Sequence, residues 1–222
     1  SAFDTGKSFS ASRLAAWWID THPPGEAIVV TTATTHAQVR AILWQEIGAA
    51  HRKSKLLPGH VNQTEWWIGD ILVGFGRRPR DWSPDAFTGI HRPYVLVIID
   101  EASGVPKTIF DACEGLITNA DSRIQAIGNP YAPDSHFAHI CRPDSPWNVI
   151  PISAFDTPAY TGERMPDIAM RSLISRVWVD ENTKEWGTDS PLYITKILGK
   201  FPDESDDQLL PLSWVQAAID AH

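Results

Sequence analysis

Ser1-Ala2-Phe3-Asp4-Thr5-Gly6-Lys7-Ser8 is the stretch that decides the fold of this chain. It has the composition of a phosphate-binding loop, in which backbone N–H groups surround the phosphates, a lysine meets the β- and γ-phosphate oxygens and a serine hydroxyl binds Mg²⁺. A helix is expected directly afterwards, over residues 9–19, with Phe9, Leu14, Trp17 and Trp18 on one side. A phosphate at its N-terminus would gain N–H donors and a favourable dipole. The alternative is an ordinary Gly-Lys-Ser turn, since Ser1 stands where such loops usually have glycine.

A second stretch, Val95-Leu96-Val97-Ile98-Ile99-Asp100-Glu101, gives the first one its meaning. Consecutive apolar residues are typical of a buried strand, so the two carboxylates would emerge where that strand meets a crevice. Asp100 can hold a magnesium ion, and Glu101 can orient and deprotonate the attacking water. The alternative for an Asp-Glu pair is a solvated loop start or a helix cap. The two stretches in this order predict ATP hydrolysis.

The composition excludes several classes of protein. The 222 residues, 43% of them hydrophobic, suffice for one sizeable globular domain. There is no run of about 18 apolar residues and no charged-then-apolar leader, which predicts neither a membrane span nor a signal peptide. Cys113 and Cys141 have no metal-ligand spacing, and the eight His show no zinc signature. The net charge of −8 argues against a broad basic face for nucleic acid.

Strand and helix signals alternate along the chain. Strands are expected at 27–32, 66–75 (a strand or a hairpin turning at Gly69-Asp70), 95–99, 123–127 and 149–152. Helices are expected at 9–19, 36–49, 107–119, 167–180 and 190–199. Loops are expected at 51–64 and 76–93. This alternation predicts an α/β fold of the P-loop NTPase (RecA-like) type, with a mostly parallel sheet flanked by helices and its ligand at the carboxyl ends of the strands.

The strand that normally feeds a phosphate loop is missing from this sequence. We therefore expect the chain to be an N-terminally incomplete part of a longer protein. Residues 1–204 would be the P-loop ATPase domain, and residues 205–222 would begin a connection to a C-terminal domain.

Asn129 and two basic clusters are further candidates. Asn129, at the tip of the strand expected at 123–127, could hydrogen-bond the γ-phosphate or the water and report its loss to the following segment, or it could simply form an Asn-Pro turn. Each basic cluster could simply be solvated surface. Alternatively, it could contact phosphate or supply an arginine to the nucleotide of a neighbouring subunit. Their members are Arg52, Lys53 and Lys55, and Arg77, Arg78 and Arg80.

An ordered set of stretches resembles the ATPase domain of the large terminase subunit of tailed bacteriophages, the motor that drives DNA into the empty capsid. The set covers nearly the whole chain and is more specific than any one motif. It comprises TATTHAQVRAILWQEI (32–47), FTGIHRPYVLVIIDEAS (87–103), IQAIGNP (124–130), SAFDTPAYTGE (153–163), SPLYITKILGKFPDES (190–205) and LLPLSWVQAAI (209–219).

The resemblance implies a role for each matching residue. Thr5, Gly6, Lys7 and Ser8 would bind the nucleotide, and Ser8 and Asp100 would bind the metal. Glu101 and Lys7 would be catalytic. Asn129 would couple hydrolysis to movement.

The chain departs from the family pattern at several positions. Ser1 replaces a small Gly or Ala, and Asp4 lies where an Arg can occur. Some members place an arginine, donated to the next subunit's nucleotide, just before the Gly that precedes the acidic strand. Thr88 stands there, so Arg92, or one of Arg77, Arg78 and Arg80, is the candidate for this role.

The resemblance also implies cofactors, partners and a location. ATP and Mg²⁺ would be bound, and contact with double-stranded DNA would be weak or transient in this acidic domain. The portal protein and the small terminase subunit would be partners of a homo-oligomeric ring, with no membrane involved, in the host cytoplasm at the procapsid portal. In the family an RNase-H-like nuclease follows the ATPase, so no nuclease chemistry is expected in these residues.

Two other functions compete with this interpretation. A two-lobed helicase also has a Gly-Lys-Ser loop and an Asp-Glu-Ala box, but it needs a second RecA-like lobe, and Gly128-Asn129-Pro130 differs from its usual Ser-Ala-Thr motif. A degenerate NTP-binding scaffold is favoured by Ser1 and Asp4. Lys7 and Glu101 argue against it, because a scaffold does not need a water-activating carboxylate.

Overall fold

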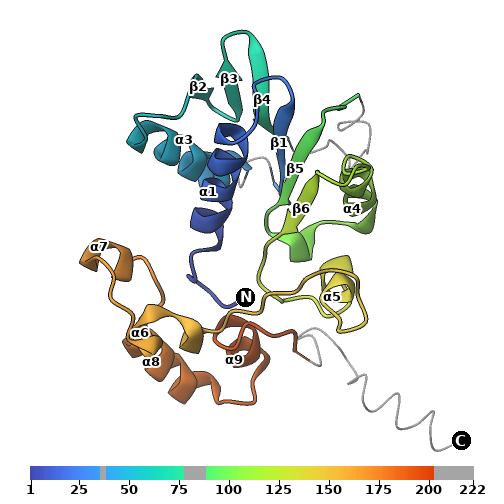
Figure 1. Ribbon diagram of the computed structural model, residues 1–222. Coiled ribbons are helices and arrows are strands. Elements are labelled where there is room, and N and C mark those ends of the chain that lie inside the picture. The colour runs from blue at the N-terminus through green and yellow to red at the C-terminus, as the bar shows by residue number, and fades with distance from the viewer. Residues whose placement is uncertain (36–38, 78–88, 203–222) are drawn as a thin grey trace, which may run out of the picture. The chain divides into compact units, whose positions relative to one another are not determined.

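The computed structural model describes residues 1–35, 39–77 and 89–202 (Figure 1). The chain divides into two compact units. The sheet unit comprises Gly6–Gly128. The helical unit comprises Ser1–Thr5 together with the chain from Asn129 onward.

Within the described residues, the sheet unit contains one sheet of six strands in the order β2-β3-β4-β1-β5-β6. Strands β4, β1, β5 and β6 run parallel, whereas β2, β3 and β4 pair antiparallel. The predicted α/β fold with a mostly parallel sheet is therefore confirmed. The strands are β1 (Ala27–Thr32), β2 (His60–Asn62), β3 (Glu65–Ile68), β4 (Ile71–Gly76), β5 (Tyr94–Ile99) and β6 (Arg123–Ala126).

Helices α1 (Lys7–Asp20) and α3 (Trp44–Lys53) cover one face of this sheet (Figure 1). Their buried residues form one cluster with Val29 of β1 and with Leu96 and Ile98 of β5. The π-helical turn η1 (Val39–Leu43) leads into α3. The 3₁₀ turn η4 (Ala102–Gly104) and helix α4 (Lys107–Glu114) follow β5, and α4 lies beside β5 and β6 in Figure 1.

Most predicted elements of the sheet unit are present, with shifted ends. Residues 27–32 form β1, and the stretch 66–75 is the β3–β4 hairpin that turns at Gly69-Asp70. The loop expected at 51–64 is wrong in part, because it contains the end of α3 and strand β2. The helix expected at 107–119 ends at Glu114, and of the helix expected at 36–49, residues 36–38 lie outside the described chain.

Helix α1 buries a different set of residues from the one expected. Phe9 and Trp17 are each 55% exposed. Its buried residues are Ala11, Ser12, Ala15, Ala16, Trp18 and Ile19. Small side chains let α1 approach the sheet closely, so the face that includes Ala11 and Ala15, and not the one with the most aromatic residues, turns inward.

The helical unit consists of short helices, three of which begin at a serine whose hydroxyl accepts a backbone N–H: Ser135, Ser175 and Ser190. The single helix expected at 167–180 is instead two, because Ser175 caps a new one.

The strand expected at 149–152 is absent from this described segment, since Pro151 has no N–H to donate and the carbonyl of Ile152 accepts the N–H of Ala2. The helices are α5 (His136–Ile140), α6 (Pro158–Thr161), α7 (Asp167–Met170), α8 (Arg176–Trp186) and α9 (Pro191–Lys196), with the 3₁₀ turn η5 (Ala154–Asp156).

The core of the helical unit is a small cluster of Ala154, Ile174, Val179, Tyr193 and Ile197. No helix in the described parts of the chain is long and apolar enough to cross a membrane.

Candidate functional site

The predicted phosphate loop ends in the first turn of α1. Gly6 is the N-cap residue and has a φ of 82°, in the left-handed region that glycine adopts without strain. The N–H of Ser10 donates to the carbonyl of Gly6 (2.9 Å), and no side chain caps the helix. A left-handed residue leading into an uncapped helix turns successive N–H groups toward one point, which is the geometry that binds an anion. Lys7 and Ser8 are the first two residues of this turn.

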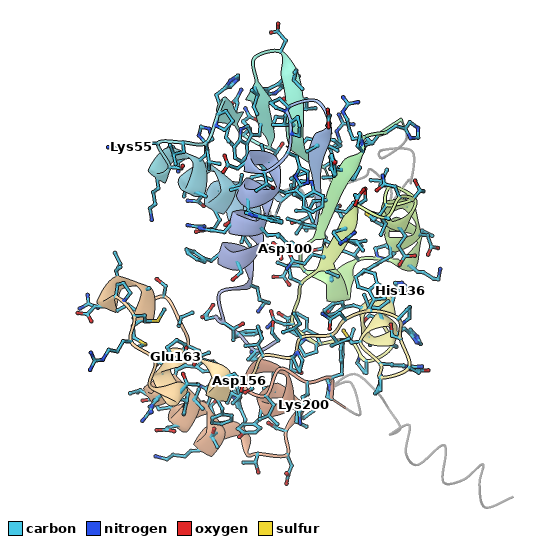
Figure 2. All side chains as sticks on the ribbon, in the orientation of Figure 1. Lys55, Asp100, His136, Asp156, Glu163 and Lys200 are labelled. Atoms are coloured by element: carbon cyan, nitrogen blue, oxygen red, sulfur yellow. The ribbon has the colours of Figure 1, made fainter. Side chains whose placement is uncertain are left out.

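The acidic pair follows directly after β5. Asp100 is 3% exposed, and its N–H donates to the carbonyl of Thr32 at the end of β1 (2.8 Å). One carboxylate oxygen, Oδ1, accepts the N–H of Glu101 (2.9 Å). The other, Oδ2, is buried and has no hydrogen-bond partner among the described residues. Figure 2 labels Asp100 within the sheet unit.

Lys7 and Asp100 interact through space. Burial raises the pKa of Asp100 from 3.8 to about 6 and is the largest influence on it. The hydrogen bond from the N–H of Glu101 lowers this pKa, the negative charge of Glu101 raises it, and the ammonium of Lys7 lowers it. The fold therefore brings the phosphate-loop lysine within electrostatic range of the acid that follows β5.

Glu101 has an unusual backbone conformation. Its φ of 49° and ψ of 45° are left-handed, which costs a non-glycine residue about 1–2 kcal/mol. The next residue, Ala102, is held by its N–H bond to the carbonyl of Ile127 after β6 (3.0 Å). Strain of this kind persists where the surrounding structure fixes it, and it is typical of functional sites. The Glu101 side chain is half-buried.

The residues present fit a magnesium ion that is bound together with phosphates. Mg²⁺ usually takes one or two protein oxygens and completes its shell with water and phosphate oxygens. The unpartnered Oδ2 of Asp100 and the hydroxyl of Ser8 are donors of this type. Among the described residues, no group of three or more His, Cys, Asp and Glu could hold a metal by itself.

Two predicted site residues lie in the helical unit. Asn129 is 5% exposed, and its Nδ2 donates to the carbonyl of Ser1 (3.0 Å). This bond joins Asn129 to the start of the predicted phosphate loop. The hydroxyl of Thr5 donates to the carbonyl of Ala2 (3.3 Å), within the loop itself.

The candidate arginines are exposed or lie outside the described chain. Arg92 is exposed and its Nη1 donates to the neighbouring carbonyl of His91 (3.1 Å). Arg77 is exposed, with its guanidinium 4.7 Å from the ring centroid of Phe75. Both line one cavity of about 260 Å³. Arg78, Arg80 and Thr88 lie outside the described residues.

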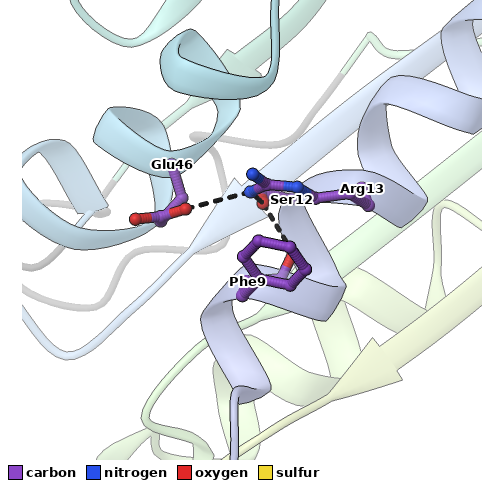
Figure 3. A network of polar contacts seen from close by, with 4 residues as sticks. All are labelled: Phe9, Ser12, Arg13 and Glu46. Carbon is purple, nitrogen blue, oxygen red and sulfur yellow. Dashed lines mark hydrogen bonds and ion pairs between the residues drawn. The ribbon is translucent and has the colours of Figure 1, made fainter. Parts of the chain in front are cut away.

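Sequence reasoning missed the network that ties α1 to α3 (Figure 3). Nη1 of Arg13 lies 2.9 Å from Oε2 of Glu46 and also donates to the hydroxyl of Ser12 (2.7 Å). The guanidinium carbon lies 3.6 Å from the ring centroid of Phe9. This network holds the helix whose first turn carries Lys7 and Ser8. The position of Arg13 in the sequence gives no signal for a partner 33 residues away.

Comparison with known proteins agrees with the resemblance expected from the sequence. Over 145 residues the chain is 31% identical to a probable terminase large subunit of Enterobacteria phage P7, a match that covers 63% of this chain and 27% of that protein. The resemblance to the terminase large subunit is confirmed. The chain thus spans about a quarter of the length of this relative. No family model matches the chain.

Solved terminase structures share the fold. A mutant ATPase domain of the large terminase of Thermus phage P74-26 aligns with a TM-score of 0.60 at 17% identity, over 90% of this chain and 86% of that one. The large terminase of a thermophilic bacteriophage, in complex with ADP, aligns with a TM-score of 0.55 at 13% identity, over 91% of this chain and 47% of that one. The chain therefore has the fold of a terminase ATPase domain.

Proposed function

We propose that these residues are the ATP-hydrolysing motor domain of a phage terminase large subunit, which powers translocation of viral DNA into the procapsid. The observation that carries the proposal is that Lys7, in the first turn of α1, lies within electrostatic range of Asp100, in the acidic pair after β5, and its ammonium lowers the pKa of that acid. Both residues belong to the sheet unit, so this arrangement lies within one compact body. The ADP complex of the thermophilic bacteriophage terminase supports nucleotide binding by this fold.

Each residue has a chemical role in this proposal. The N–H groups of Thr5, Gly6 and the first turn of α1 bind the phosphates, and Lys7 offsets the charge that builds on the γ-phosphoryl oxygens. Ser8 and Asp100 hold Mg²⁺, which when bound polarises the phosphates. Glu101 orients the attacking water and takes its proton. Asn129, bonded to Ser1, couples the loop to the segment that follows it.

The wider assignments are also proposals. The ATPase domain would span residues 1–204, and residues 205–222 would begin the connection to a C-terminal nuclease domain. The partners would be double-stranded DNA, the portal protein and the small subunit, in a ring at the procapsid portal in the host cytoplasm. Arg92 is the candidate for the arginine given to a neighbouring subunit. Residues 203–222 lie outside the described chain.

The direct test is Glu101→Gln in the full-length protein. Because the amide cannot accept the proton of the water, ATP turnover is expected to fall by about 10² or more while ATP still binds. Glu114→Gln, an exposed carboxylate at the end of α4, is the matched control and should keep its turnover. Equal turnover in Glu101→Gln would remove Glu101 from its role.

A second experiment separates a packaging motor from a helicase. A motor should be stimulated by procapsids together with DNA, whereas a helicase should unwind a duplex in their absence. Duplex unwinding without procapsids would refute the packaging assignment.

A further inference from the structure

The first half of the phosphate loop is fixed inside the helical unit. Each of its first four residues makes a hydrogen bond to a different, distant segment of that unit. The bonds are Ala2 N–H to the carbonyl of Ile152 (2.7 Å), Phe3 N–H to the carbonyl of Lys196 (3.1 Å), Ile174 N–H to the carbonyl of Asp4 (3.1 Å) and Asn129 Nδ2 to the carbonyl of Ser1 (3.0 Å). Ala2 is completely buried. The path of the loop before Thr5 is therefore set by residues far along the chain.

Gly199 passes against this loop so closely that no side chain fits. A Cβ atom at Gly199 would lie 2.4 Å from the nitrogen of Ala2, 2.6 Å from the carbonyl oxygen of Ile152 and 2.8 Å from the carbonyl carbon of Ser1. The first two atoms are the donor and the acceptor of the Ala2–Ile152 hydrogen bond. A methyl group at Gly199 would be wedged into that bond. All three neighbours are backbone atoms, so the chain itself would have to move.

The segment that carries Gly199 is itself held in place. Ile197 is completely buried, and its carbonyl accepts the N–H of Ala154 (2.8 Å). On the other side of Gly199, the N–H of Lys200 donates to the carbonyl of Ile194 (3.1 Å). Crowding at Gly199 would therefore be relieved at the loop, where the Ala2–Ile152 bond would break.

We propose that Gly199 is a positioning residue for the nucleotide, because its missing side chain leaves the room in which Ala2 bonds Ile152 and so sets the path of the phosphate loop. The inference rests on the proposed function of that loop. Only Thr5 separates Asp4 from Gly6, so the first four residues are joined by the chain itself to the N–H groups that are proposed to bind phosphate. Hydrogen bonds weaken steeply when their geometry is distorted, so small displacements of these N–H groups weaken binding.

Gly199→Ala tests this inference, with Gly162→Ala as its matched control in the full-length protein. Both glycines have a positive φ (65° and 77°), so both substitutions strain the backbone in the same way. A Cβ at Gly162, however, meets nothing within 4 Å. The Kd for ADP and the kcat and KM for ATP hydrolysis are measured at a temperature where circular dichroism shows both variants folded.

The expected result is a rise of about tenfold or more in the Kd for ADP and the KM for ATP in Gly199→Ala, with both values near wild type in Gly162→Ala. Loss of folded protein alone would lower kcat and leave Kd and KM unchanged, so this readout separates positioning from stability. A Gly199→Ala variant that binds ADP and ATP as tightly as Gly162→Ala would overturn the inference.

Asn129→Ala supplies a second variant if Gly199→Ala does not fold. It removes the bond to the Ser1 carbonyl and adds no atom near the loop. ADP is the informative ligand, because it lacks the γ-phosphate. A clamped loop predicts a higher Kd for ADP, whereas unchanged ADP affinity would overturn the clamp. A wild-type protein that neither binds nor hydrolyses ATP would refute the proposed function and this inference with it; a wild type that does both, with unaffected variants, refutes the inference alone.

Discussion

Replacing Asp100 by Asn is expected to stabilise the protein at neutral pH while removing its activity. Asp100 is 3% exposed, and burial is the main reason why the pKa of its carboxyl group is raised from 3.8 to about 6. The hydrogen bond from the Glu101 N–H and the positive charge of Lys7 both lower this pKa, but by less than burial raises it. The folded protein therefore holds a charge that the unfolded chain would solvate better.

The size of the effect follows from the two pKa values. One pKa unit corresponds to about 1.4 kcal/mol, so the rise from 3.8 to about 6 destabilises the folded state by about 3 kcal/mol above pH 6. Between these two pH values the folded state binds more protons, so the free energy of unfolding falls as the pH rises. Asn is neutral, has nearly the same shape and keeps an oxygen for the Glu101 N–H. Asp100→Asn should thus gain about 3 kcal/mol at pH 7.5 and about 1 kcal/mol at pH 4.5.

The assay is denaturant unfolding followed by fluorescence of the 10 Trp, without nucleotide or magnesium. In the proposed mechanism Asp100 holds magnesium, so ATP turnover of the same variant should be lost, because a neutral amide is a poorer magnesium ligand than a carboxylate. The exposed Asp121→Asn is the control and should change the free energy of unfolding by less than about 0.5 kcal/mol. A less stable Asp100→Asn protein at pH 7.5, or a gain that does not shrink on acidification, would refute the reasoning.

Two further predictions concern the pH dependence of ATP hydrolysis and the contact between helices α1 and α3. In the proposed mechanism Asp100 must be charged to hold the metal, so kcat/KM for ATP hydrolysis should decline below a pH of about 6. A flat profile from about pH 5 to pH 8 would contradict this. The Arg13–Glu46 ion pair is half-exposed. A double-mutant cycle of Arg13→Gln and Glu46→Gln should therefore give a coupling energy of about 0.5 kcal/mol, and this energy should fall at high salt. Strictly additive variants would show that the pair does not stabilise the contact between α1 and α3.

Apolar runs were the most predictable parts of the fold. Residues 27–32 were expected as a strand and form β1, because a strand buried on both faces is a continuous apolar stretch in any context. The strand predicted at 149–152 does not form, although its residues are equally apolar. Apolar character does not supply a partner strand, and the carbonyl of Ile152 is used by Ala2 instead.

Helix faces were harder to predict than helices. The residues of α1 were identified within two positions of its start, yet Phe9 and Trp17 are exposed, although both were expected on its apolar side. Periodicity identifies a helix, but the depth at which the helix packs on the sheet depends on the size of facing side chains. That depth selected the alanine face of α1.

By itself, the sequence determined the local chemistry: a Gly-Lys-Ser turn before a helix, and two acids after an apolar strand. These features depend on residues that are neighbours in the chain. Only the tertiary structure decided that the ammonium of Lys7 acts on Asp100, that Asp100 is buried deeply enough to reach a pKa of about 6, and that Gly199 lies against Ala2. Such contacts join segments that are far apart in the chain, and their distances are set by the packing of whole helices and strands, which no local pattern of residues encodes.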